Sequence, residues 1–443
     1  DVNGNSASDA SDAVFTIQGT TSLALASNSN PSVKGESVTL TATITPSAAS
    51  GTVTFYDGAT SLGTASLASG SASLSTSALS VGSHSLSAVY GGAATYLTST
   101  SNTVSQTVNA AATTTSLASD VNPSVKGQSV TLTATVAASS PGSGTPSGSV
   151  TFYDGATSLG SATLASGSAS LSTSALSVGS HSLTAVYAGG TDYTTSTSNT
   201  VSQAVNAAAT STSLASSQNP TVVGQSTTLT ATVSASSPGS GTPTGSVTFY
   251  DGATSLGTAS LSGGAASIGV SSLALGSHSL TAVYAGTSDY TTSTSNTVTQ
   301  AVNQGSTSTS VASTPNPSVY GQSVAITATV AVSSPGAGTA TGSVTFYDGS
   351  TSLGTATLSG GSATINTSAL SVGSHSLSAV YGGSSDFGGS TSSTSSHTVN
   401  QATATASVSS SPNPSKVGQS VTISATVAAV SPGAGTPSGS VEF

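Results

Sequence analysis

The sequence predicts an all-β chain in which several β-sandwich domains follow one another. Its 443 residues are too many for one sandwich, which takes about 100 residues. The chain is 35% hydrophobic, and its Val, Leu and Ala accompany abundant Ser, Thr, Gly and Asn, a composition that favours strands and turns over helices. Several motifs recur with a period of 97 residues, which is typical of a tandem array.

The charge of the chain excludes some classes of partner. Only 4% of the residues are charged, and three lysines against thirteen acidic residues give a formal net charge of −10. Nucleic-acid binding requires clustered cations that neutralise phosphates, and an anionic membrane surface has the same requirement. The chain has no cysteine for disulfides. No apolar run approaches the ~18 residues of a membrane span. We therefore expect no nucleic-acid partner and no membrane span in this segment.

Three motifs mark the period. They are Phe-Tyr-Asp-Gly, starting at Phe55, Phe152, Phe249 and Phe346; Gly-Ser-His-Ser-Leu, starting at Gly82, Gly179, Gly276 and Gly373; and Asn-Pro, starting at Asn30, Asn122, Asn219, Asn316 and Asn413. The first Asn-Pro gap is 92 residues instead of 97, which places a five-residue deletion in a loop between Thr43 and Val53. Loops absorb such length changes at little cost.

This period predicts four complete repeats with an incomplete segment at each end. Repeats one to four are expected at 20–111, 112–208, 209–305 and 306–402, joined end to end. Residues 403–443 restart the unit and stop before its second half. Residues 1–19 are expected to be the end of a different, preceding domain, with its closing strand at 13–17. We interpret the chain as a window on a longer polypeptide.

Apolar and polar residues alternate along the segments of each repeat. In repeat two, apolar residues at 130–136 alternate with Thr131, Thr133 and Thr135, which predicts a strand with the threonines exposed. The apolar positions of the later strand, exemplified by Leu86, Ala88 and Tyr90 in repeat one, are expected to be buried. Asp154-Gly155 predicts a two-residue hairpin turn. Seven or eight short strands per repeat result.

Four longer motifs recur in order and carry a family resemblance. In repeat two they are Asn122-Pro-Ser-Val-Lys-Gly-Gln-Ser-Val-Thr-Leu-Thr-Ala, Gly148-Ser-Val-Thr-Phe-Tyr-Asp-Gly, Gly179-Ser-His-Ser-Leu-Thr-Ala-Val-Tyr-Ala-Gly and Ser196-Thr-Ser-Asn. Over residues 20–443 the unit resembles the bacterial immunoglobulin-like repeat domain of large surface proteins. The resemblance implies an extracellular module without catalysis, used in adhesins, stalks and secreted enzymes. It also implies that Tyr187 ties back to the backbone near the preceding corner.

One histidine and one aspartate recur in every repeat. They are His84, His181, His278 and His375, and Asp57, Asp154, Asp251 and Asp348. A Ser-His-Asp triad is one oriented constellation and not a copy in each repeat, so we expect each histidine to cover the rim of the core or to bond a turn. Each aspartate stands alone beside a glycine and fits a turn better than a calcium site, which needs several oxygen ligands. We predict no cofactor and no metal or catalytic residue.

A weak calcium site between repeats stays open as an alternative. It would require the loops that carry Asp192, Asp289 and Asp386 to converge on a second carboxylate.

A row of tyrosines beside the core phenylalanines is the candidate contact surface. Tyr153, Tyr250 and Tyr347 have the outward parity of their strands. With one such tyrosine per repeat and no tryptophan, contacts between repeats or neighbouring chains are favoured over a glycan platform.

The uniform repeats predict a structural extracellular protein. We expect the shaft of a surface stalk, fibre or adhesin that self-associates into filaments or bundles. The alternatives are a glycan- or protein-binding module, a spacer for a secreted hydrolase, and ligand binding through domains outside this segment.

Overall fold

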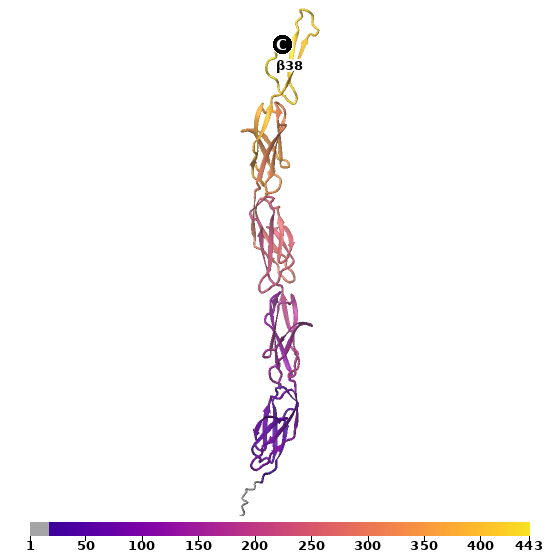
Figure 1. Cartoon of the computed structure of the whole chain (residues 1–443), viewed down its shortest axis with the longest axis vertical. Helices are drawn as coiled ribbons and strands as arrows, with labels where there is room; N and C mark the ends of the chain where they lie inside the picture. The colour runs from indigo at the N-terminus through magenta and orange to yellow at the C-terminus, as the bar shows by residue number, and fades with distance from the viewer. Residues whose placement is uncertain (1–16) are drawn as a thin grey trace, which may run out of the picture. The chain divides into compact units, whose positions relative to one another are not determined.

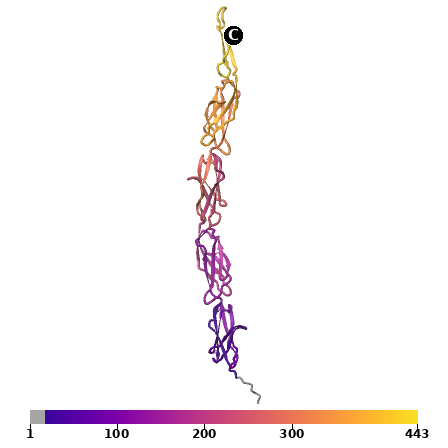
Figure 2. The same cartoon turned by 90° about the vertical axis from the view of Figure 1, so that its left-hand side faces the viewer.

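The computed structural model describes residues 17–443, and this part of the chain contains strands, turns and loops but no helix. It follows that no helix in the described residues could cross a membrane. The strands form four similar groups and one final pair (Figure 1 and Figure 2). Residues 13–16 of the closing strand expected at the N-terminus lie outside the described residues, and Ile17 lies in no strand.

The four groups contain the same nine strands in the same order. Group one has β1 (Ser22–Ser27), β2 (Ser32–Val33), β3 (Val38–Thr45), β4 (Thr52–Asp57), β5 (Thr60–Ser66), β6 (Ser71–Thr76), β7 (Gly82–Tyr90), β8 (Ser99–Thr100) and β9 (Val104–Asn109). Group two has β10 (Thr113–Ser119), β11 (Ser124–Val125), β12 (Val130–Ala138), β13 (Ser149–Asp154), β14 (Thr157–Thr163), β15 (Ser168–Thr173), β16 (Gly179–Tyr187), β17 (Ser196–Thr197) and β18 (Val201–Asn206). Group three has β19 (Thr210–Ser216), β20 (Thr221–Val222), β21 (Thr227–Ala235), β22 (Ser246–Asp251), β23 (Thr254–Ser260), β24 (Ala265–Val270), β25 (Gly276–Tyr284), β26 (Ser293–Thr294) and β27 (Val298–Asn303). Group four has β28 (Thr307–Thr314), β29 (Ser318–Val319), β30 (Val324–Val332), β31 (Ser343–Asp348), β32 (Thr351–Thr357), β33 (Ser362–Thr367), β34 (Gly373–Tyr381), β35 (Ser390–Thr391) and β36 (Ser395–Asn400).

Each group forms a three-stranded and a six-stranded sheet. In group two the smaller sheet has the order β10-β12-β15, and the larger has the order β11-β18-β16-β13-β14, with β17 paired to β16. The pairings are antiparallel except that of β11 with β18, which is parallel. The chain therefore begins in the smaller sheet with β10 and crosses to the larger sheet with β11. The predicted fold class, a tandem array of immunoglobulin-like β-sandwiches, is confirmed.

Burial follows the predicted alternation. Val130, Leu132, Ala134 and Val136 on one face of β12 are at most 2% exposed. The residues predicted to be buried in β7, namely Leu86, Ala88 and Tyr90, are fully buried. Because one face of each sheet must cover the core, a period of two fixes the strand register.

The outer face of β12 is less exposed than predicted. Thr135 is exposed as predicted, whereas Thr131 and Thr133 have the predicted parity but are half-buried. Their hydroxyls share hydrogen bonds of 3.2 and 3.1 Å with the hydroxyls of Ser172 and Ser170 on the neighbouring strand β15. Cross-strand neighbours on the same face cover each other.

The hairpin after Phe152 differs from the predicted Asp-Gly turn. Asp154 pairs with Thr157 as the last residue of the β13–β14 ladder, so Gly155 and Ala156 form the two-residue loop. Gly155 has a φ of +55°, and a glycine at the first loop position is typical of a type II′ turn. The aspartate therefore ends the strand, and its side chain bonds elsewhere.

Tyr187 is held by a different bond from the one that the resemblance implied. Its hydroxyl donates to the carbonyl oxygen of Ser147 at 2.8 Å, and not to the corner that precedes its own strand. The reason lies in the register, which pairs Tyr187 at the end of β16 with Val150 at the start of β13. The ring therefore reaches the loop that enters β13.

The last pair of strands forms a sheet without a second layer. β37 (Ala404–Ser411) pairs with β38 (Thr422–Ala429) in antiparallel fashion and lies at the yellow end of the chain in Figure 1. Val408 and Ile423 are 67% and 53% exposed, whereas the equivalent Leu117 and Leu132 of group two are buried. Residues 403–443 thus present the inner face of a sandwich.

Candidate functional site

A contact between one histidine and one aspartate recurs in every repeat. In repeat two, Nδ1 of His181 on β16 lies 2.6 Å from Oδ2 of Asp154 at the end of β13. Its Nε2 lies 2.9 Å from the carbonyl oxygen of Ser177, in the connection before β16. The backbone N–H of Ser182 donates to Oδ1 of Asp154 at 3.2 Å. The histidine thus joins two neighbouring strands to the connection between the sheets.

The geometry is nearly identical in the other three repeats. In each of them Nδ1 of the histidine lies 2.6–2.7 Å from the aspartate carboxylate, and Nε2 lies 2.8 Å from a backbone carbonyl oxygen. The histidine, aspartate and carbonyl residues are His84, Asp57 and Ser80 in repeat one; His278, Asp251 and Ala274 in repeat three; and His375, Asp348 and Ser371 in repeat four. The histidine side chains are only 8–13% exposed.

The surroundings favour the doubly protonated imidazolium. Carboxylate and carbonyl oxygens only accept hydrogen bonds, so both ring nitrogens donate. Burial lowers the pKa of His181, but the bonds to Ser177 and Asp154 and the charge of Asp154 together outweigh it, and the pKa lies above its ordinary value. The pKa values of His84 and His375 rise for the same reasons. For His278 the bond to the Ala274 carbonyl is the largest influence, and its pKa rises too.

This geometry suits cross-linking of strands and opposes proton transfer. A general base needs an unprotonated nitrogen within reach of a substrate proton, and a metal ligand needs an unprotonated nitrogen as well. Both nitrogens of His181 donate to oxygens of the protein itself. Among residues 17–443, no three His, Cys, Asp or Glu side chains gather into a group that could hold a metal ion. The contact therefore stabilises the sandwich.

The two aspartates of repeat two that the calcium alternative would combine have different partners. Asp154 contacts His181, whereas Oδ2 of Asp192 lies 3.6 Å from Nζ of Lys34 in repeat one. The side chains of Lys34 and Asp192 are both partly exposed, and such ion pairs contribute about 1 kcal/mol or less to the stability of a protein. The carboxylates of Asp154 and Asp192 do not form a shared oxygen cluster.

The tyrosines chosen from the sequence lie on the outer face of the larger sheet. Tyr153, Tyr250 and Tyr347 are half-buried residues of β13, β22 and β31. Tyr56 on β4 has the same position and was missed, although it belongs to the same Phe-Tyr-Asp-Gly motif. Contact of these tyrosines with other repeats or other chains stays a prediction.

A side-chain clamp extends the parallel pairing of β11 with β18. The ladder itself joins Ser124 to Val205 and Val125 to Asn206. Nδ2 of Asn122 donates to the Ser202 carbonyl at 2.8 Å, and its Oδ1 accepts from the Ala204 N–H at 3.1 Å. Asn30, Asn219 and Asn316 make the same two bonds in their repeats. The asparagine of the Asn-Pro motif, which marks the period in the sequence, thus joins the first strand of the larger sheet to the last.

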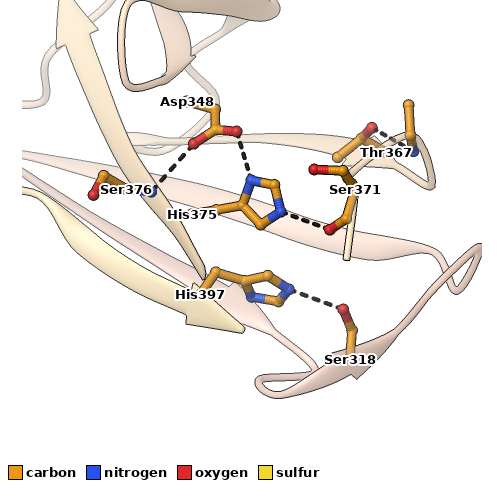
Figure 3. A network of polar contacts seen from close by, with 8 residues as sticks. Ser318, Asp348, Thr367, Ser371, His375, Ser376 and His397 are labelled. Carbon is orange, nitrogen blue, oxygen red and sulfur yellow. Dashed lines mark hydrogen bonds and ion pairs between the residues drawn. The ribbon is translucent and has the colours of Figure 1, made fainter. Parts of the chain in front are cut away.

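A buried polar residue stands opposite the histidine on the last strand. In repeats one to three it is glutamine, as in Gln203, whose Nε2 donates to the Val121 carbonyl at 2.9 Å and whose Oε1 accepts from the Ser119 hydroxyl at 2.7 Å. In repeat four it is His397 (Figure 3). His397 is not among the candidate residues predicted from the sequence, although a fifth histidine breaks the pattern of one per repeat.

Some solved structures are similar to this chain at low identity. The fibronectin(III)-like modules of Clostridium thermocellum CbhA are 20% identical, with 43% of this chain and 94% of that chain covered and a TM-score of 0.18. Sidekick-1 immunoglobulin domains 1–5 are 13% identical, with 86% and 81% covered and a TM-score of 0.24. Domains from titin are 11% identical, with 63% and 100% covered and a TM-score of 0.28. Curated proteins gave no match.

The match to a protein family covers most of the chain. The family model described as bacterial Ig-like domain (group 3) matches residues 25–109, 117–206, 214–303 and 311–400. The four matches each span one of the nine-strand groups from its first to its last strand. The chain therefore belongs to the bacterial immunoglobulin-like domain family, group 3.

Proposed function

We propose that the chain is the load-bearing shaft of an extracellular stalk, fibre or adhesin, and that its repeats set distance and resist extension. Membership of a tandem immunoglobulin-like family supports a structural or spacer role. The proposal that the repeats bear load rests on the clamp of Asn122 on the parallel strands β11 and β18.

Parallel pairing of β11 and β18, the first and last strands of the larger sheet, suits a repeat that is pulled at its two ends. Tension draws β11 toward the N-terminus and β18 toward the C-terminus, so it acts along the strands and loads their hydrogen bonds together. The bonds of Asn122 to Ser202 and Ala204 lie in the same interface, and so does the bond of the Lys126 N–H to the Asn206 carbonyl at 2.8 Å. Bonds loaded together resist more force than bonds broken one after another.

The internal bonding of the repeats also supports a passive mechanical role. Within residues 17–443, no buried side-chain nitrogen or oxygen lacks a hydrogen-bond partner. The histidine nitrogens that could do chemistry bond to the protein itself in all four repeats. Such satisfied polar contacts make a sandwich rigid and specific.

Single-molecule force spectroscopy on the full chain tests this proposal. We expect four unfolding events, each releasing roughly 300 Å of chain, the length of about 90 extended residues. Asn122→Ala should lower the force of one event, whereas Asn199→Ala, which removes bonds to Leu117 outside the β11–β18 interface, should lower it less. Equal forces in Asn122→Ala and the unmodified chain would contradict the clamp.

One feature favours the alternative of a binding module. In repeat three a hollow of about 510 Å³ is lined by Asp251, His278, Thr254, Ser255 and Ser271, among others. Its hydroxyl and carboxylate groups suit a polyhydroxylated ligand such as a glycan. Glycan-array binding that Ser255→Ala and Ser271→Ala together abolish, in a chain that yields ordinary force curves, would establish this second role beside the shaft.

A further inference from the structure

Repeat four differs from the other three at the buried position opposite the histidine of β34. His397 on β36 is fully buried, like Gln106, Gln203 and Gln300 at the same place in the other repeats. Its Nδ1 lies 2.9 Å from the hydroxyl of Ser313, and its Nε2 lies 2.9 Å from the hydroxyl of Ser318. Because a serine hydroxyl can donate or accept, a neutral imidazole satisfies both contacts, donating with one nitrogen and accepting with the other.

A second imidazole, already paired with a carboxylate, stands directly across the ladder. The β34–β36 register pairs His375 with His397, and Figure 3 shows both rings on the same side of the sheet. Side chains directly opposite in an antiparallel pair have Cβ atoms about 4.5–5.5 Å apart. His375 contacts Asp348 at 2.6 Å and the Ser371 carbonyl at 2.8 Å. A proton added to His397 would therefore place two cations beside one carboxylate.

The elements packed against β36 offer no second carboxylate. β28 and β29 contribute Ser313 and Ser318 and have no titratable residue. β34 contributes His375 and also Tyr381, whose hydroxyl donates to the Thr341 carbonyl. Behind β34, Asp348 on β31 is the carboxylate that already binds His375. Burial lowers the pKa of His397, and the charge of His375 lowers it further against a smaller opposing effect of Asp348.

We propose that His397 makes repeat four the acid-sensitive member of the array, so that mild acidification opens this repeat before the other three. The sandwich holds His397 neutral between two hydroxyls, whereas the unfolded chain exposes it to water and accepts the proton readily. The amide side chains of Gln203 and its counterparts take up no proton at these pH values. The same position thus distinguishes a repeat that acid destabilises from three in which glutamine gives acid no such effect.

The direction of the effect follows from proton linkage. A histidine whose pKa is lowered in the folded state stabilises that state above its ordinary pKa of 6.5, and the contribution is lost as the pH falls below that value. A histidine with a raised pKa, such as His181, behaves in the opposite way: its contribution is complete below 6.5 and is lost as the pH rises. As the pH falls in repeat four, His375 adds to the stability of the folded state and His397 subtracts from it, so the two effects oppose each other.

The experiment uses the full chain and two reciprocal variants. His397→Gln gives repeat four the residue of the other repeats, and Gln203→His places the histidine in repeat two, where Ser119 and Ser124 have the equivalent positions. Hydrogen exchange of peptides from repeats two and four is measured by mass spectrometry in the same sample, in moderate urea, at about pH 7.5 and 5.5. Comparing the two repeats within one sample removes the intrinsic effect of pH on exchange.

We expect acidification to raise the opening of repeat four relative to repeat two, by up to about tenfold per pH unit because one proton is bound on opening. His397→Gln should abolish this change, and Gln203→His should confer acid sensitivity on repeat two. A titration of the five histidines by NMR should place the midpoint of His397 below that of the others. An unchanged ratio in the unmodified chain, or a midpoint of His397 at or above 6.5, would overturn the proposal.

Discussion

Removal of the carboxylate of Asp154 is the most direct test of the histidine contact. Asp154→Ala deletes the 2.6 Å contact with His181 and the 3.2 Å bond from the Ser182 N–H. The His181 side chain, which is 10% exposed, then keeps only the Ser177 carbonyl as a partner. A nearly buried imidazolium without its counter-charge is costly, so the folded state of repeat two loses stability.

The expected loss is about 2–3 kcal/mol. Hydrogen bonds to charged groups contribute about 1.5–3 kcal/mol, and the bond of Ser182 adds about 1 kcal/mol. Water reduces these values because the Asp154 side chain is 27% exposed. For a domain of 60–100 residues, 1 kcal/mol lowers Tm by about 4–8 °C, so we expect the Tm of repeat two to fall by about 10–20 °C.

Differential scanning calorimetry of the full chain measures this loss. Stability in a repeat array is nearly additive, so roughly a quarter of the heat should move to a separate transition at lower temperature. Asp120→Ala is the matched control, because the exposed Asp120 accepts a bond from the uncharged Thr131 N–H at 2.7 Å and faces no imidazolium. Its loss should be about 1 kcal/mol. A shift for Asp154→Ala no larger than that of Asp120→Ala would refute the role of the pair.

Three further outcomes are expected. Tyr187→Phe removes the bond to the Ser147 carbonyl and should cost repeat two about 1–2 kcal/mol in urea unfolding, and an unchanged midpoint would mean that the bond contributes nothing. Raising the pH from about 6 to 9 should lower the Tm of repeats one to three. The pKa values of their histidines are raised in the folded state, so the stability that each histidine contributes is complete below pH 6.5 and is lost as the pH rises above the folded pKa. His181→Gln should remove this dependence from repeat two. A chelator should leave the Tm unchanged, because Asp154 and Asp192 have His181 and Lys34 as partners, and a clear fall on chelation would restore the calcium alternative.

Local pattern was enough to predict the layers of each sandwich. The alternation along 130–136 identifies the buried face of β12, because side chains of a strand point to opposite faces in turn. Phe152 and Tyr153 are adjacent in β13, so their side chains point to opposite faces, with Phe152 in the core and Tyr153 on the outer face. The exposure of Thr131 was overstated, because it depends on Ser172 in a strand some forty residues away.

The candidate site was harder to find because each repeat copies every spacing. His181 and Asp154 were both noticed in the sequence, yet each recurs every 97 residues, so nothing in the periodicity pairs one with the other. The hairpin loop consists of Gly155 and Ala156, so Asp154 is still paired with Thr157 in the β13–β14 ladder. The pairing of β13 with β16 then brings Asp154 close to His181. A turn prediction alone gives the aspartate a different role.

The sequence by itself determined the all-β class, the period of 97 residues and the buried face of the main strands, because these depend on neighbours along the chain. Only the tertiary structure decided which distant polar groups meet. The clamp of Asn122 on β18 and the position of His397 opposite His375 depend on which strands are neighbours in the larger sheet. That order follows from how two sheets close around one core, and a local pattern does not contain it.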